Sequence, residues 1–386
     1  MIGRIVELLN NYVLARISGR PSCAAFWYSP DYPNITDSKS LAAYKTETPS
    51  PFYPICYRSR TTFPVRNDEG IVMLPYPEPI GVQINPEAAF QTALGYHDCW
   101  VSRQDDEAKK TFLTYASFFK ERQSDEGKWY YQFDWYENKA PWASALAQAR
   151  GASVMLRAFL LTGEQEYRHA ALSAISSFDV PSSKGGFLSV FEPTGSVYFE
   201  EYPSQENVTL NGFLATLFGL WELSYWLESE QASRLLKIGV KSAEAMLPYY
   251  SIGWWTLYDT LKPAGRPNVH SPRYHKMCVG YLAALSAMTG SQVLIEQAQR
   301  WKRMDTLFNR LRAYWLKTKI KLLVGAPCDD VAAAAVGLVL EAAVLDHPAL
   351  RGKFPGTGVH PMPGRGSVEQ RDEAVLRLGI LFICTD

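Results

Sequence analysis

Pairs of helical segments joined by short turns constrain this 386-residue chain more than any other feature. The pairs cover residues 142–161 and 164–177, 207–228 and 230–246, and 272–288 and 291–317. In LLTGEQEYRHAA (160–171) and AMTGSQVLIEQA (287–298), a Thr-Gly step ends one helix and leads into the next. Repeated antiparallel hairpins of this kind predict a mainly α fold, an (α/α) toroid or barrel.

The composition and hydrophobic pattern change along the chain, and they predict three parts. Residues 1–80 contain short strand-like runs, FYPICYRS and GIVMLPYP, broken by turn residues, and we expect a small β-containing N-terminal region there. Residues 81–325 hold the helix pairs and are the expected (α/α) barrel, and any chemistry is expected there. In residues 326–386 aromatic side chains almost disappear, so we expect an atypical, flexible tail without chemistry.

The charges of the chain balance, with 39 Lys and Arg residues against 39 Asp and Glu residues. This balance gives no case for binding nucleic acid or an anionic membrane by bulk electrostatics. The six cysteines lie far apart, and no His or Cys residues have metal-ligand spacing. We therefore expect no metal, no disulfide scaffold and no cofactor.

The apolar residues of the chain are interrupted too often to indicate a membrane span, because no stretch of about 18 of them occurs. At the N-terminus, Glu7, Asn10 and Asn11 break the apolar run that a signal peptide needs. The sequence therefore predicts a cytoplasmic protein.

Aromatic side chains are abundant, with 22 Tyr, 18 Phe and 11 Trp residues. Most of them must pack in the core, but Tyr and Trp also supply flat surfaces on which sugar rings stack. The composition therefore favours a carbohydrate ligand. The candidates for stacking are Trp142, Tyr131, Trp135, Trp254 and Trp255.

Longer loops are expected at one rim of such a barrel, and here they are residues 124–141, 179–206 and 248–271. The stretch VYFEEYPSQENVTLNGF (197–213) crosses the second of them and places Glu200 beside Glu201. Two adjacent carboxylates in a cleft raise each other's pKa through repulsion and burial. This pair is the strongest candidate for acid–base chemistry in the sequence.

Three blocks of sequence follow one another in order: PWASALAQARGASVMLRAFLLTG (141–163), EEYPSQENVTLNGFLATLFGLWEL (200–223) and LYDTLKPAGRPNVHSPRYHKMCVGYL (257–282). Together they resemble the catalytic domain of the D-glucuronyl C5-epimerases. The resemblance covers roughly residues 80 to 320. Leu261 stands where the family has an arginine after Y-D, Cys278 replaces a histidine after Y-H, and Ala149 replaces the glycine of A-Q-G.

The resemblance implies conversion of glucuronate to iduronate within a heparosan or heparan-type polysaccharide. Inverting C5 requires one group on each face of the sugar, one to remove a proton and one to return it. On one face the resemblance points to Glu201 with its neighbour Tyr202. On the other face it points to Tyr274, with Tyr258 as an alternative or as support.

The residues expected to contact the substrate come from the same blocks. They are Trp142, Gln148, Arg150, Glu200, Asn211, Lys262, Arg266, Asn268, Arg273 and His275. Lys262 or Arg266 can replace the missing arginine as the partner of the uronate carboxylate. Arg273, Lys262 or His275 can lower the pKa of the phenol, which otherwise ionises near 10.

Two other readings stay open from the sequence. A uronate polysaccharide lyase on the same toroid would share the first proton abstraction and then expel the C4 substituent. A non-catalytic protein would only bind the acidic polysaccharide, and the lost arginine and histidine would mark a decayed site. The resemblance also implies a homodimer.

Overall fold

The computed structural model describes residues 21–27, 31–46, 49–203, 208–262 and 265–324. The predicted tail, residues 326–386, and the N-terminal stretch with Glu7, Asn10 and Asn11 lie outside the described residues.

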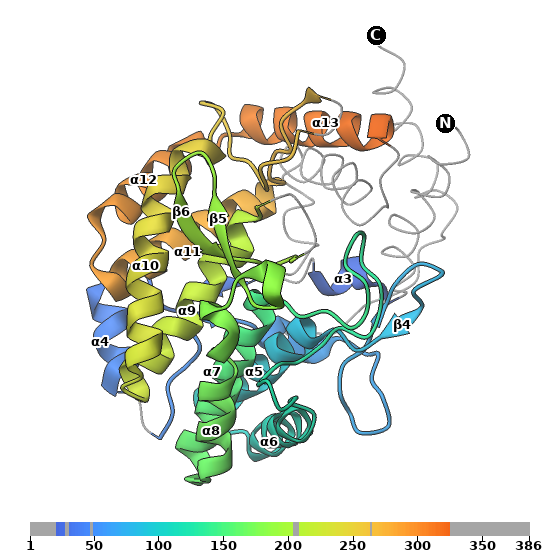
Figure 1. The fold of residues 1–386 in the computed structure, drawn as a ribbon, viewed down its shortest axis with the longest axis vertical. Helices are drawn as coiled ribbons and strands as arrows, with labels where there is room; N and C mark the ends of the chain where they lie inside the picture. The colour runs from blue at the N-terminus through green and yellow to red at the C-terminus, as the bar shows by residue number, and fades with distance from the viewer. Residues whose placement is uncertain (1–20, 28–30, 47–48, 204–207, 263–264, 325–386) are drawn as a thin grey trace, which may run out of the picture.

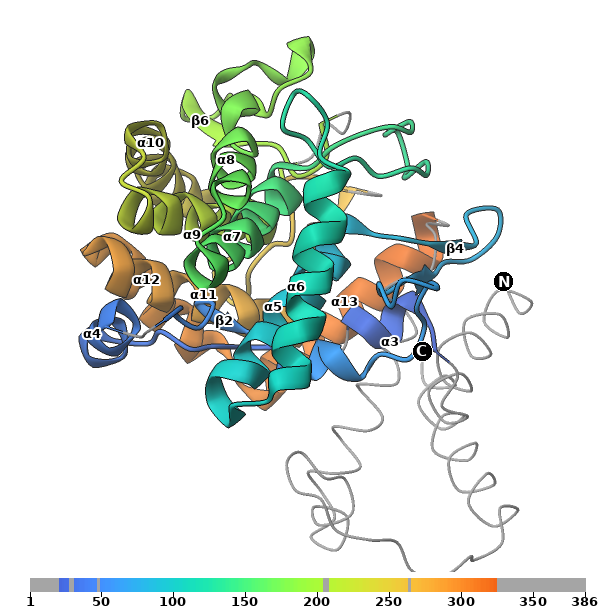
Figure 2. The same cartoon turned by 90° about the horizontal axis from the view of Figure 1, so that it is seen from below.

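Within these ranges, most of the chain forms four antiparallel helix hairpins. They are α5 (Pro86–Arg103) with α6 (Asp106–Glu121), α7 (Ala145–Thr162) with α8 (Gln165–Ser173), α9 (Leu210–Trp226) with α10 (Glu230–Met246), and α11 (Pro272–Thr289) with α12 (Gln292–Met304). Helices α5, α7, α9 and α11 pack on one another in sequence order, and their partners lie outside them (Figure 2). The mainly α, (α/α) toroid architecture is confirmed.

The turns of the hairpins have the backbone that their residues favour. Gly163 and Gly290 both cap their helices with φ of 76°, a left-handed conformation that glycine adopts at no steric cost. At the helix starts, Asn85 accepts a hydrogen bond from the amide of Ala88 at 3.0 Å. The two similar Thr-Gly segments of the sequence therefore form the same type of turn.

The prediction of one helix over residues 291–317 is wrong, because two helices occupy this segment. Helix α12 ends at Met304, and α13 (Leu307–Val324) begins after Asp305 and Thr306. The Thr306 hydroxyl accepts from the amide of Asn309 at 3.2 Å, and Asp305 holds Arg310 with contacts of 2.6 and 2.9 Å. A polar pair that caps the second helix therefore breaks the run.

The N-terminal region has little regular structure. It contains α3 (Cys23–Trp27), α4 (Ser38–Thr46), the 3-10 helix η2 (Arg58–Thr62) and two short antiparallel ladders, β1 (Tyr32–Pro33) with β2 (Ile55–Cys56) and β3 (Leu74–Pro75) with β4 (Val82–Gln83). Elements β2 and η2 pack on α5, whereas β1 and α4 pack on α11. This region therefore joins the first inner helix to the last (Figure 1). The domain boundary near residue 80 stays a prediction.

The other short elements lie in the long connections. They are the hairpin β5 (Leu188–Phe191) with β6 (Ser196–Phe199) and the 3-10 helices η3 (Ser176–Asp179), η4 (Ser182–Lys184) and η5 (Leu247–Tyr250).

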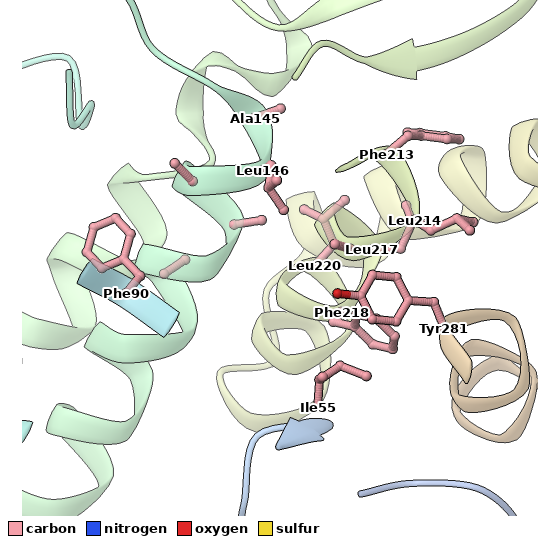
Figure 3. Close-up of a cluster of buried hydrophobic side chains, with 14 of the residues drawn as sticks. Ile55, Phe90, Ala145, Leu146, Phe213, Leu214, Leu217, Phe218, Leu220 and Tyr281 are labelled. Atoms are coloured by element: carbon pink, nitrogen blue, oxygen red, sulfur yellow. The ribbon is translucent and has the colours of Figure 1, made fainter. Parts of the chain in front are cut away.

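Helix α9 lies at the centre of the core. Its side chains Leu214, Leu217 and Phe218 are buried, and the Phe218 ring meets Tyr281 of α11 edge-on with centroids 5.4 Å apart (Figure 3). The polar face that a surface helix would need is missing because α9 is covered on both sides by α7 and α11. Among the helices of the described ranges, none has the length and apolar character to cross a membrane.

A buried ion pair joins α7 to α9. Arg157 and Glu222 have no exposed surface, and they make two contacts of 2.7 and 3.0 Å. Arg157 also donates to the carbonyl of Phe52 at 2.7 Å, and Tyr44 donates to Glu222 at 2.6 Å. These groups come from four separate segments, so the pair fixes the N-terminal region on the inner helices.

Replacing Glu222 with Gln should lower the free energy of unfolding by about 3 to 5 kcal/mol, because Arg157 keeps a buried charge without its counter-ion. Chemical denaturation measures this change. The matched control is Arg234→Met, which removes the exposed 2.6 Å pair with Asp179 and should cost no more than about 1 kcal/mol. Equal losses in the two variants would contradict the assignment.

Candidate active site

The long connections all lie at one rim because they leave outer helices and enter inner ones. They span residues 122–144, 174–209 and 247–271, and each leads to the N-terminal end of an inner helix, α7, α9 or α11. The short turns of the hairpins lie at the opposite end. The predicted gathering of the long loops follows from this alternation of helix direction.

Two of these loops are fixed by the helix ends beside them. The amide of Ala145, the first residue of α7, donates to the carbonyl of Glu200 at 2.9 Å. The amide of Leu210, the first residue of α9, donates to the carbonyl of Tyr258 at 3.2 Å. The cap residues Ser144 and Thr209 make no side-chain cap, so backbone carbonyls take their place. Helix α7 thereby holds the loop that leads into α9, and α9 holds the loop that leads into α11.

The adjacent carboxylates Glu200 and Glu201 lie just after β6 and point into different surroundings. Glu200 accepts from the Tyr198 hydroxyl at 2.8 Å, and burial raises its pKa. Glu201 lies against the first turn of α9, where a Cβ on Gly212 would meet its Oε2 at 1.9 Å. The glycine in L-N-G-F is therefore required for Glu201 to occupy this place.

Glu201 has an unusual acidity. Burial raises the pKa of its carboxyl group from 4.5 to about 8, although its Tyr202 neighbour and the Arg150 charge act in the opposite direction. The charges that contribute most to raising this pKa further are those of Glu87 and Asp259. A carboxyl group with this pKa can both hold and release a proton near neutral pH.

Tyr202 connects Glu201 to the other two predicted tyrosines. Burial raises the pKa of Tyr202 well above 10, and the nearby Glu201, Tyr258 and Tyr274 raise it further. The rings of Tyr258 and Tyr274 meet edge-on with centroids 5.4 Å apart. The structure therefore brings together all four residues predicted as catalytic.

A second buried pair lies beneath this group. Arg150 of α7 contacts Glu87 of α5, and its guanidinium lies over the Tyr57 ring at 5.0 Å from the centroid. Among the described residues, the Nε and Nη2 atoms of Arg150 have no hydrogen-bond partner, and neither has Oε2 of Glu87. Arg150 is only 2% exposed, so these groups are withdrawn from water.

Further polar atoms at the same helix ends are also without partners within the described ranges. They are the hydroxyl oxygens of Ser144 and Thr209, Oδ1 of Asn211 and Oε2 of Glu201. Folded proteins leave few buried polar atoms unsatisfied, and each one calls for an explanation. Their concentration at the N-terminal ends of α7 and α9 marks this place as the candidate active site.

Several residues predicted to contact substrate serve the scaffold. Gln148 accepts from the Trp129 amide at 3.2 Å and donates to its carbonyl at 3.0 Å. Asn268 donates to Asp259 at 2.9 Å. His275 is buried, bonds with both nitrogens and has a pKa lowered by burial to about 4.

The aromatic and cationic candidates are spread more widely. The Trp142 ring stacks on Tyr131 at 4.0 Å and lies 6.0 Å from the Tyr202 ring. Arg273 pairs with Asp31 at 3.4 Å. On the loop before α11, Lys262 is exposed and Arg266 is half-buried. The structure thus places Trp142 at Tyr202, whereas Lys262 lies at the surface.

Three charged residues beside the site did not stand out in the sequence. Glu87 and Asp259 act on the pKa of Glu201, and Lys317 of α13 lies over the Tyr258 ring at 5.2 Å while donating to the carbonyl of Val269 at 3.2 Å. Asp259 follows Tyr258 in the third block, so the Y-D step is a signal for it. Glu87 and Lys317 lie within ordinary helices, and only packing reveals them.

Within the part of the chain that the structure describes, no three His, Cys, Asp or Glu side chains converge as metal ligands would.

Residues 123–303 match the family model described as the D-glucuronyl C5-epimerase C-terminus. A D-glucuronyl C5-epimerase of Caenorhabditis elegans is 30% identical over 222 residues, which are 52% of this chain and 36% of that protein. The uncharacterized protein MJ1128 of Methanocaldococcus jannaschii is 30% identical over 179 residues, which are 45% of this chain and 56% of that protein. The match therefore spans about a third to a half of the length of these relatives.

Among solved structures, the unsaturated glucuronyl hydrolase of Bacillus sp. GL1 overlays with a TM-score of 0.40 at 16% identity, covering 59% of this chain and 61% of that one. The matched range contains Arg150, Glu201, Tyr202, Tyr258 and Tyr274 of the candidate site. Residues 123–303 therefore match the D-glucuronyl C5-epimerase family, as the sequence blocks predicted.

Proposed function

We propose that this site inverts C5 of glucuronate units in an acidic polysaccharide of the heparosan type, giving iduronate. The match to the epimerase family model supports an epimerase, and one observation of the site carries the proposal. A carboxyl group with a pKa of about 8, Glu201, lies at Tyr202 together with two further phenols, Tyr258 and Tyr274.

In the proposed reaction, the Glu201 carboxylate takes the proton from C5 and the C–H electron pair moves into the adjoining substrate carboxylate. A phenol on the other face, Tyr274 or Tyr258, then gives its proton to C5. Exchange with water returns both groups to their starting states. A pKa near the working pH suits Glu201 to this exchange, because both protonation states are then populated.

Negative charge accumulates on the substrate carboxylate in the transition state, so a fixed cation beside it accelerates the reaction. We assign this role to Arg150, whose charge is near enough to lower the Glu201 pKa and whose Nε and Nη2 have no partner among the described residues. A guanidinium binds a carboxylate through two parallel hydrogen bonds, which the exposed Lys262 cannot do. Arg150 would thus replace the arginine missing at Leu261.

A phenol needs help to lose its proton near pH 7. The Lys317 ammonium over the face of Tyr258 supports a partial negative charge on that ring. The proposal therefore gives Lys317 the part that the sequence assigned to Arg273, Lys262 or His275. A homodimer stays a prediction.

Glu201→Gln should lower the rate of deuterium incorporation at C5 roughly 100-fold to 10,000-fold, because the amide cannot accept the proton. The assay uses an unsulfated uronate polymer in heavy water. Glu200→Gln is the matched control and should keep most of the rate, since its side chain still accepts from Tyr198.

A parent protein that exchanges no C5 proton with any uronate polymer would refute the epimerase. Polysaccharide binding by that inactive parent would then identify a binding protein. Absorbance of an unsaturated product would identify a lyase.

The free energy of unfolding should depend on pH through the carboxyl group of Glu201. Its pKa is raised in the folded state, so the folded chain holds a proton that the unfolded chain loses above about pH 4.5, and stability falls as pH rises toward 8. Glu201→Gln removes this dependence. The free energy of unfolding of the variant should exceed that of the parent by about 1 kcal/mol or more at pH 8, with a smaller difference at pH 5. A difference independent of pH would contradict the raised pKa.

Arg150→Gln should raise KM for a uronate oligosaccharide by about 10-fold to 100-fold, the loss expected for a charged hydrogen bond. Lys262→Gln is the control and should leave KM nearly unchanged. Because Arg150 also pairs with Glu87, the double variant Glu87→Gln, Arg150→Gln keeps the site neutral and should show the same rise. If the Lys262 variant alone loses affinity, the carboxylate partner is on the loop before α11.

A further inference from the structure

Behind the two site tyrosines lies a third ring, the imidazole of His270. It is parallel to the Tyr274 ring, with an angle of 8° and centroids 6.2 Å apart. It meets the Tyr258 ring edge-on, with an angle of 89° and centroids 5.9 Å apart. His270 has no exposed surface, so its ring is available to orient the phenols but not to bind a ligand.

His270 belongs to a continuous series of hydrogen bonds, which we call the imidazole chain. His270 Nδ1 lies 2.9 Å from the Thr256 hydroxyl, which lies 2.8 Å from Nδ1 of His275. Nε2 of His275 lies 3.0 Å from the carbonyl of Trp301. At the other end, Cys278 Sγ lies 3.6 Å from Nε2 of His270. One hydroxyl therefore connects two buried imidazoles.

The order of the protons follows from the fixed acceptor at one end. The Trp301 carbonyl only accepts, so Nε2 of His275 carries a proton. Burial lowers the pKa of His275 to about 4, so its Nδ1 is unprotonated at pH 7 and accepts from the Thr256 hydroxyl. Thr256 then has only lone pairs left, and Nδ1 of His270 must donate to them. Each group in the chain has one role.

The backbone around the imidazole chain joins the two segments that carry the tyrosines. The amide of His270 donates to the carbonyl of Thr256 at 2.9 Å, and the Trp255 indole donates to the carbonyl of His270 at 2.9 Å. The Trp255 ring also stacks on His275 at 3.9 Å. Thr256 precedes Tyr258 by two residues and His270 precedes Tyr274 by four, so this frame sets the distance between them.

We propose that Thr256 and His270 are positioning residues. The Thr256 hydroxyl fixes the orientation of the His270 ring, and this ring fixes Tyr258 against Tyr274. The inference rests on the proposed function, because it gives the two phenols a part in proton transfer. Neither Thr256 nor His270 touches the substrate. Their effect should therefore appear in the rate of the chemical step and not in affinity.

The test compares Thr256→Val with Thr256→Ser. Valine keeps the branched shape but leaves both Nδ1 atoms without their partner, so kcat for C5 proton exchange should fall about 10-fold or more with KM nearly unchanged. Serine keeps the hydroxyl and should restore most of kcat. A valine variant with the kcat of the parent, or a serine variant as slow as valine, would overturn the proposal. Rates are expressed per folded molecule, from the unfolding curve of each variant.

A second measurement does not depend on activity. Nitrogen-15 NMR of histidine-labelled parent protein should show Nδ1 of His270 and Nε2 of His275 protonated from pH 5 to 8. His270→Gln assigns the first signal. An unprotonated Nδ1 at His270 would refute the imidazole chain even if Thr256→Val does not fold. If the imidazole chain is present but the parent protein exchanges no C5 proton, the proposed function fails, whereas the order of the hydrogen bonds stands.

Discussion

Backbone carbonyls that cap inner helices are the contacts on which the site depends. Helices α7 and α9 begin with Ser144 and Thr209, residues that commonly cap a helix, yet their first amides bind the carbonyls of Glu200 and Tyr258. A side-chain cap would satisfy these amides locally and leave the loops unattached. The carbonyl caps instead attach the segment with Glu201 to α7 and the segment with Tyr258 to α9. Residues more than fifty positions apart are thereby held at one rim.

The two buried arginine–glutamate pairs differ in how fully their polar atoms are hydrogen-bonded. Arg157 and Glu222 bond to each other and further to Phe52 and Tyr44, so both carboxylate oxygens of Glu222 have partners. Arg150 and Glu87 also pair, but each keeps polar atoms without a partner among the described residues. Since leaving buried polar atoms unsatisfied is costly, the second pair is a poor choice for stability alone. Its place beneath Glu201 is consistent with a role in binding an anion.

The raised pKa of Glu201 shows where reasoning from neighbours in sequence reaches its limit. The adjacent Glu200 is the obvious source of repulsion, but its carboxylate accepts a hydrogen bond from Tyr198. Burial has the largest effect, and the nearby carboxylates belong to α5 and to the loop after α10. In the same way His275, which stands next to Tyr274 in the sequence, points into the core and reaches the tyrosines only through Thr256 and His270.

The sequence by itself determined the elements of local structure: the helix hairpins, the Thr-Gly turns at Gly163 and Gly290, and the loops that carry Glu201, Tyr258 and Tyr274. These depend on residues within a few positions of one another, whose backbone preferences and caps can be read directly. The break at Asp305 was missed because a short polar step inside an apolar pattern resembles a helix surface. Only the tertiary structure decided that Glu87, Arg150 and Lys317 lie beside the site while Lys262 lies at the surface. Burial and Coulomb interactions depend on which helices pack together, and this is a property of the whole fold.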